Sequence, residues 1–249
     1  MGAIFYREMK AYFSSLLAWS LIAAFLAVVG FFMLLGMMQY AEISASAMQG
    51  AMPYNINTYF IPSMSNGIGL FLMFFMPLLT MRIFAEDKRS GMLDLLFTYP
   101  LSDWAIVLGK FWATMVVVAL MLAFSSLSYI FLSVYCTVEW PIVLSGYLSL
   151  LLMGASMAAI GLFTSSLSSS QLVASALNYG ALLLMWLLYI PDSRDAVYTA
   201  LFGKLSIMSH TESLLKGVLN AQDIIYYLAV TIFFLYLTVC FIESRKWRG

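Results

Sequence analysis

Charged residues are scarce in this sequence. Twelve Lys or Arg and twelve Asp or Glu make up only 10% of the 249 residues, whereas an ordinary soluble domain holds about 25%. Hydrophobic residues reach 63%. A chain with so little polar surface cannot stay soluble as a monomer, so we expect a membrane protein. The net charge is zero, which gives no electrostatic reason to expect a nucleic-acid partner.

The apolar runs do not alternate with polar residues, as the strands of a membrane β-barrel would. They are continuous and about 19 residues or longer, as helices that cross a bilayer require. Every backbone polar group inside a bilayer needs an internal hydrogen-bond partner, and helices supply one. We therefore predict an all-α polytopic membrane protein with six transmembrane helices, an N-terminal interfacial helix and short external helices between spans five and six.

Residues suited to catalysis or metal binding are few. His210 is the single histidine and falls in a predicted external loop, which excludes a histidine-based metal site or a Ser-His dyad within the bilayer. No P-loop is present, so the chain does not bind ATP by that route. We predict no catalytic, cofactor-binding or metal-binding residue in this chain. Cys136 and Cys240 are expected at opposite ends of two spans and therefore to be free thiols.

Six apolar runs predict the spans, within a single transmembrane domain over residues 1–249. They cover about 16–38, 58–81, 104–135, 142–164, 172–190 and 224–242. Pro77 is expected to kink the second span. Lys110 is the only Asp, Glu, Lys, Arg or His in any of the six, and its side chain is expected to extend outward to the lipid headgroups. The first run has 23 residues, too many for the apolar region of a signal peptide, so we interpret it as a retained span.

The distribution of basic residues predicts the orientation. With the N-terminus inside, the inner segments carry eight basic residues and the outer segments carry three, as the positive-inside rule requires. The eight are Arg7, Lys10, Arg82, Lys88, Arg89, Arg245, Lys246 and Arg248, and the three are Arg194, Lys204 and Lys216. Both termini are therefore predicted on the cytoplasmic side.

Two segments outside the spans have helical patterns. In "IFYREMKAYFSS", the apolar residues fall broadly on one face with Arg7, Glu8 and Lys10 elsewhere, which is typical of a helix lying in the membrane interface. The alternative is the charged N-terminal flank of a signal anchor. Residues 191–222 predict two short external helices, the second capped by Ser209 with Glu212 completing a capping box. They would form a lid over an exit path or serve only in packing.

The segment "FAEDKRSGMLDLLFTYPLSDW", residues 84–104, holds six of the 24 charges. It belongs to a predicted cytoplasmic loop, residues 82–103, in which Gly91 separates the charges from "MLDLLF" and Ser102 or Asp103 caps the third span. An apolar patch rimmed by charge favours a contact surface for another protein. The alternative is a loop helix that lies on the bilayer. Since the spans hold only Lys110, energy for transport would have to enter through this loop.

Several stretches of the sequence resemble a known family. The stretch "PLLTMRIFAEDKRSGMLDLLFTYPLSDWAIVLGKF" resembles the cytoplasmic loop of type-2 ABC transporter permeases, especially the gliding-motility-like branch. The stretches "SHTESLLKGVLNAQDIIYYL" and "ESRKWRG" resemble the same branch. One departure is the inner loop "TSSLSSSQ", where relatives often have a basic residue before the Gln.

The resemblance implies a six-span permease subunit in the cytoplasmic membrane of a prokaryote. It would work with a second permease copy or a paralogue and with two separate ABC ATP-binding subunits, which carry the ATP and Mg. The N-terminal helix would be the interfacial elbow helix, and residues 191–222 the external re-entrant helices. The cytoplasmic loop would be the coupling helix. By matching position, its ATPase-coupling residues are Glu86, Asp87, Lys88, Arg89, Gly91, Leu93 and Asp94.

The sequence is compatible with functions of three classes. The first is the permease of an ATP-driven exporter, and an apolar path without charges would fit lipids, lipid-linked glycans, peptides or drugs. The second is a non-transporting membrane anchor or assembly protein that recruits a soluble partner through its cytoplasmic loop. The third, an autonomous secondary carrier, is disfavoured because the spans lack ionisable residues. For a dimer, the small residues Gly154, Ala155, Ala158 and Gly161 offer a contact face, although the same face could pack within one subunit.

Overall fold

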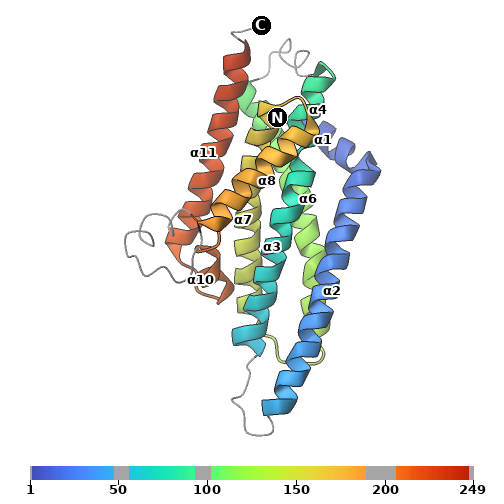
Figure 1. Cartoon of the computed structure of the whole chain (residues 1–249), viewed down its shortest axis with the longest axis vertical. Coiled ribbons are helices and arrows are strands. Elements are labelled where there is room, and N and C mark those ends of the chain that lie inside the picture. The colour runs from blue at the N-terminus through green and yellow to red at the C-terminus, as the bar shows by residue number, and fades with distance from the viewer. Residues whose placement is uncertain (1, 48–55, 93–101, 189–205, 247–249) are drawn as a thin grey trace.

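The computed structural model describes residues 2–47, 56–92, 102–188 and 206–246 (Figure 1). Over these ranges the chain is helical and has no β-strand, which confirms the all-α prediction. The longest helices run nearly parallel or antiparallel to one long axis (Figure 1). This is the arrangement of a membrane helix bundle, in which each segment satisfies its own backbone hydrogen bonds.

Five of the described helices are long and apolar enough to cross a bilayer. They are α2 (Leu16–Ala47), α3 (Ile61–Thr80) with its extensions, α6 (Asp103–Ser133), α7 (Trp140–Leu167) and α11 (Ala221–Lys246). The fifth predicted span, 172–190, coincides with α8 (Gln171–Leu187), whose 17 residues are somewhat fewer than the roughly 20 that a 30 Å core requires. A short π-helical turn, η1 (Ile56–Phe60), precedes α3.

The small residues of α7 pack inside the subunit. Gly154, Ala158 and Gly161 are all buried. A Cβ atom on Gly161 would lie 2.3 Å from Thr80 Oγ1 and 2.8 Å from Asn178 Nδ2, so α3, α7 and α8 approach closely there. A Cβ on Gly154 would lie 3.0 Å from Val118 of α6. The small-residue face therefore brings helices of one chain together, which is the alternative of packing within one subunit.

The predicted cytoplasmic loop begins as a helix. The span helix α3 contains Pro77 and ends at Thr80, and α4 (Arg82–Arg89) follows after the single residue Met81. Ser165 of α7 bridges this junction, because its hydroxyl accepts hydrogen bonds from the backbone N–H groups of Phe84 (3.1 Å) and Ala85 (3.2 Å). The same hydroxyl donates to the Met81 carbonyl at 3.1 Å. Residues 82–89 are thus an anchored extension of the second span, in contrast to the predicted loop.

The bundle has two distinct ends. The amphipathic helix α1 (Gly2–Ser14), α4 and the end of α11 lie at one end, and α10 (Thr211–Leu215) lies toward the other (Figure 1). We call these the α4 end and the α10 end. The first described helix and the C-terminal end of the last one thus lie at the same end of the bundle.

Predictions for helix caps have mixed outcomes. Ser102 accepts a hydrogen bond from the Ala105 N–H at 3.3 Å, which confirms the predicted cap of the third span. The predicted capping box at α10 is wrong, because α10 begins after His210 and has no side-chain cap. Ser209 donates to the Ser206 carbonyl at 2.9 Å, and Glu212 pairs with Lys216 at 2.6 Å.

The other predicted external helix falls largely outside the described residues. Cys136 and Cys240 are free thiols, as predicted.

Candidate coupling site at the α4 end

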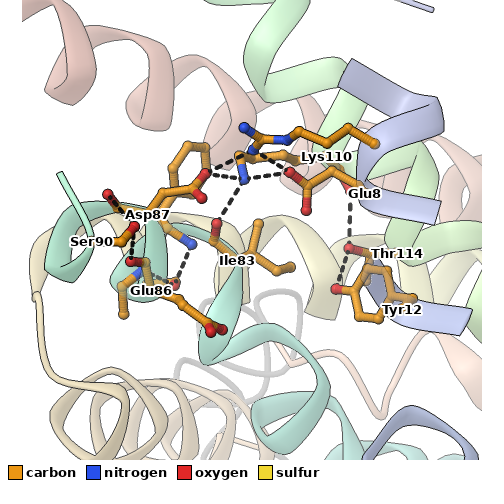
Figure 2. Close-up of polar contacts among 12 residues, drawn as sticks. Glu8, Tyr12, Ile83, Glu86, Asp87, Ser90, Lys110 and Thr114 are labelled. Atoms are coloured by element: carbon orange, nitrogen blue, oxygen red, sulfur yellow. Dashed lines mark hydrogen bonds and ion pairs between the residues drawn. The ribbon is translucent and has the colours of Figure 1, made fainter. Parts of the chain in front are cut away.

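Four charged side chains from three helices meet at the α4 end (Figure 2). Lys110 Nζ of α6 lies 2.6 Å from Asp87 Oδ2 of α4 and 2.9 Å from Glu8 Oε1 of α1. The Arg7 guanidinium bonds to the same two oxygens, at 3.1 Å from Asp87 and 2.6 Å from Glu8. We call Arg7, Glu8, Asp87 and Lys110 the four-charge cluster. Its two positive and two negative charges balance.

Lys110 points into the protein, so the prediction that it extends to the headgroups is wrong. Its side chain is fully buried, and its ammonium also donates to the Ile83 carbonyl at 2.8 Å and lies 5.1 Å from the centre of the Phe84 ring. A buried cation is tolerated only when charges and hydrogen bonds replace its hydration. Here two carboxylates, one carbonyl and one aromatic face do so.

Helix α1 packs against the bundle through a face that combines apolar and polar side chains. Ile4 and Glu8 are buried, and Tyr12 continues the same line along the helix. The Tyr12 hydroxyl lies 3.4 Å from Thr114 Oγ1 and 3.4 Å from the Leu79 carbonyl. Burial raises the pKa of the Tyr12 phenol, so this group stays neutral. The sequence pattern correctly predicted an amphipathic helix, but it placed Glu8 on the wrong face because its partner Lys110 lies 102 residues away.

Arg7 closes the cluster from the solvent side. Its side chain is 36% exposed, compared with 12% for Glu8 and 16% for Asp87. Partial burial alone would lower the pKa of the Arg7 guanidinium, but the hydrogen bond to Glu8 and the negative charges of Asp87 and Glu8 outweigh it, and the pKa is raised. Arg7 therefore stays charged and keeps the cluster neutral.

Lys88 ties α4 to the other side of the bundle. Its ammonium donates to the carbonyl of Ser166, near the C-terminus of α7, and lies 5.1 Å from the centre of the Phe241 ring in α11. A cation at a helix C-terminus interacts favourably with the helix dipole. Relatives often have a basic residue before the Gln of the segment "TSSLSSSQ", and this chain has none. Lys88 of α4 instead brings a positive charge to Ser166, near the start of that segment.

The seven predicted coupling residues divide into distinct groups. Asp87 and Lys88 make the internal contacts described above, whereas Glu86 and Arg89 are exposed. Gly91 adopts φ +70° just beyond α4, a turn that favours glycine. Leu93 and Asp94 lie outside the described residues.

Sequence analysis missed the contributions of Arg7, Glu8 and Lys110. The available signal was the solitary ionisable residue in the spans, which marks a functional or paired group more often than an outward-pointing one. Among the described residues, no group of three His, Cys, Asp or Glu side chains is arranged to hold a metal ion.

Comparison with known proteins identifies the family. The sequence model of the family described as CcmB protein matches residues 52–193, which is more than half of the chain. No curated protein matches the chain. CcmB proteins are membrane permease components of ABC-type transporters, which supports the predicted permease but gives no support to the gliding-motility-like branch. With its multiple apolar helices and the charged α4 inside the matched region, this chain belongs to the CcmB protein family of ABC transporter permeases.

Proposed function

We propose that this chain is the membrane-spanning subunit of an ATP-driven exporter, with ATP hydrolysis on a separate ATP-binding subunit that docks at the α4 end. Family membership supports a permease that works with an ABC ATP-binding subunit. The sequence has no P-loop of its own and gathers a quarter of its charges near α4. The α4 end would then be cytoplasmic, in the inner membrane of a prokaryote.

The observation that carries this proposal is the attachment of α4. Asp87 links it to α1 and α6 through the four-charge cluster. Lys88 links it to α7 and α11, and Ser165 holds its first turn. A displacement at the exposed end of α4 would therefore move several span helices together. A helix that lay loosely on the bilayer would not transmit motion in this way.

The coupling residues would have two roles. Exposed Arg89 would contact the ATP-binding subunit directly, and Leu93 and Asp94 would continue that surface as the resemblance implies. Glu86, which pairs with Arg82, would lie at the edge of that contact. Charges at the rim of an interface act mainly on association rate and register. Asp87 and Lys88 would transmit the motion into the bundle, and Gly91 would set the direction of the chain between the two groups.

A second permease copy would cover one face of α3. Ser63 and Asn66 are exposed on this span helix, which is costly in lipid, so polar side chains in spans usually face protein or an aqueous cavity. A cavity of about 690 Å³ lies beside them, also lined by Phe32 and Trp186. We propose that the cargo passes along this face, between two copies of the chain or between the chain and a paralogue.

The test is affinity purification of the tagged chain from its native membrane, with the associated proteins identified by mass spectrometry. We expect a P-loop ATPase without spans of its own. Arg89→Ala should reduce its recovery, whereas Lys10→Ala, an exposed cation on α1 at the same end, should not. A soluble partner without an ATPase site would instead favour the membrane-anchor function, and equal recovery with both variants would remove Arg89 from the interface.

The proposed pairing of two copies is tested by cross-linking. In a chain whose Cys136 and Cys240 are replaced by Ser, Asn66→Cys should form a disulfide-linked pair in the membrane. Leu172→Cys, at another exposed position on α8, is the control and should remain monomeric. If only monomer appears with both, or if mass measurement of the complex gives one permease chain, the two-copy arrangement is wrong.

A further inference from the structure

A cavity of about 340 Å³ opens beside the four-charge cluster at the α4 end. Residues of α1, the start of α2, the end of α3 and α4 line it. Pockets of this size accommodate small ligands or part of a larger one. It lies at the junction of the amphipathic helix α1 with three elements near the bundle end, and an amphipathic helix in such a place would lie at the level of lipid headgroups.

The polarity of the lining changes with depth. Leu79 precedes α4 along the second span, and Leu17 and Leu21 follow α1 along the first, so these apolar side chains lie toward the membrane interior. Arg82 and Glu86 line the part nearer the α4 end. A ligand that fits both parts has a polar head at the α4 end and an apolar portion toward the bilayer, as a phospholipid does.

Among the charged residues that line the cavity, one ion pair is available to bind a ligand. Arg7, Glu8 and Asp87 also line the cavity, but they are already neutralised together with Lys110. The remaining pair is Arg82 with Glu86, at 3.2 Å, with side chains that are 31% and 51% exposed. Such an exposed pair contributes little to stability, so a ligand can open it at small cost. Arg82 also donates to Ser15 Oγ at 3.3 Å, between α1 and α2.

We propose that this cavity binds phosphatidylethanolamine. The phosphate accepts hydrogen bonds from the Arg82 guanidinium, and the primary ammonium donates to the Glu86 carboxylate. An anionic headgroup such as phosphatidylglycerol would satisfy Arg82 but be repelled by Glu86. A choline headgroup has no N–H to donate and is usually held by several aromatic rings, whereas Tyr12 is the one aromatic residue among the lining residues that the structure describes.

The test is native mass spectrometry of the purified complex after delipidation and incubation with one lipid at a time. The three probes are phosphatidylethanolamine, phosphatidylcholine and phosphatidylglycerol with the same acyl chains. We expect the highest retention for phosphatidylethanolamine. Arg82→Gln should lower its retention about tenfold, the equivalent of one charge-assisted hydrogen bond. Lys10→Gln, which removes an exposed cation of α1 outside the cavity, should leave retention unchanged.

Glu86→Gln gives a readout that a purely structural role would not produce. It should abolish the preference for phosphatidylethanolamine over phosphatidylcholine while the two lipids remain bound to a similar extent. Equal retention of all three lipids by the native chain would overturn the proposal, as would stronger retention of phosphatidylglycerol. Unchanged retention in both Arg82→Gln and Glu86→Gln would overturn it as well. None of these outcomes depends on the identity of the ATP-binding subunit or of the cargo.

Discussion

At the scale of single residues, Lys110 shows how a charge can be placed inside a membrane protein. Its ammonium is surrounded by Glu8, Asp87 and a backbone carbonyl, and Arg7 supplies the fourth charge. The cluster is neutral as a whole, so its burial costs far less than that of one isolated ion. Removing one of the four side chains would leave a net charge on the remaining three.

Lys110→Met should destabilise the protein by about 3–5 kcal/mol, because Glu8 and Asp87 would then share only Arg7. Lys216→Met removes the cation of an exposed i,i+4 pair at the α10 end and should cost less than ~1 kcal/mol. The measurement is thermal unfolding of each detergent-purified variant.

Combining Lys110→Met with Glu8→Gln should recover part of the lost stability, because Arg7 and Asp87 then balance each other. If Lys110→Met and Lys216→Met unfold at the same temperature, the four-charge cluster does not hold α1 and α4 to the bundle.

At the scale of helices, close packing at α7 holds the region beneath α4. Thr80 is the last residue of α3, and its hydroxyl accepts a hydrogen bond from Asn178 Nδ2 of α8 at 2.9 Å. Gly161 of α7 leaves room for this contact. The junction between α3 and α4 is therefore enclosed by three helices, and the position of α4 depends on small side chains as well as on charge.

Gly161→Ala should destabilise the protein by about 1–3 kcal/mol, because its new methyl group would overlap Thr80 and Asn178. Gly180→Ala is the matched control, since a Cβ at this helical position has no neighbour within 4 Å. It should be neutral or slightly stabilising, by up to ~1 kcal/mol. Thermal unfolding compares the two, and a smaller loss for Gly161→Ala than for Gly180→Ala would contradict the packing.

Gly91 should be sensitive to backbone conformation rather than to side-chain size. Its φ of +70° is accessible to Asn but not to Pro, whose ring holds φ near about −65°. Gly91→Asn should retain ATPase recovery and ATP hydrolysis stimulated by the cargo, and Gly91→Pro should abolish both. Equal activity of the two variants would mean that the direction of the chain after α4 is unimportant for coupling.

At the scale of the whole molecule, the two ends of the bundle differ in chemistry. The four-charge cluster, α1 and α4 lie at one end, and α10 lies toward the other (Figure 1). Basic residues predict that the α4 end is cytoplasmic, with eight inside and three outside. Coupling to an ATP-binding subunit requires the same orientation.

A membrane-impermeant thiol reagent applied to intact cells tests the orientation. In the chain without Cys136 and Cys240, Lys216→Cys should be labelled and Ser90→Cys should not. Both positions are exposed, and they directly follow α10 and α4, which lie at different ends. Labelling of Ser90→Cys should appear after the membrane is permeabilised. The reverse pattern would place the α4 end outside and exclude an ATP-binding subunit there.

The sequence alone determined the class of this protein and the approximate course of its spans. Long apolar runs can be accommodated only as membrane helices, because bilayer geometry and backbone hydrogen bonding leave few alternatives. The same reasoning identified an amphipathic N-terminal helix and the charged segment after the second span. These properties depend on neighbours along the chain, so they can be recognised without knowing how the helices pack.

The tertiary structure alone decided which charges pair and which remain exposed. Glu8 and Lys110 are 102 residues apart, and no local pattern predicts that α1 and α6 bring them together. For the same reason Asp87 and Lys88 appeared equivalent to Glu86 and Arg89 until α4 was seen to pack against its neighbours. From the sequence, the small residues of α7 fit either a dimer interface or a subunit interior. The contacts of Gly154 and Gly161 with Val118, Thr80 and Asn178 show that they pack in the subunit interior. Pairing and close packing depend on contacts between distant segments, and only the assembled bundle establishes them.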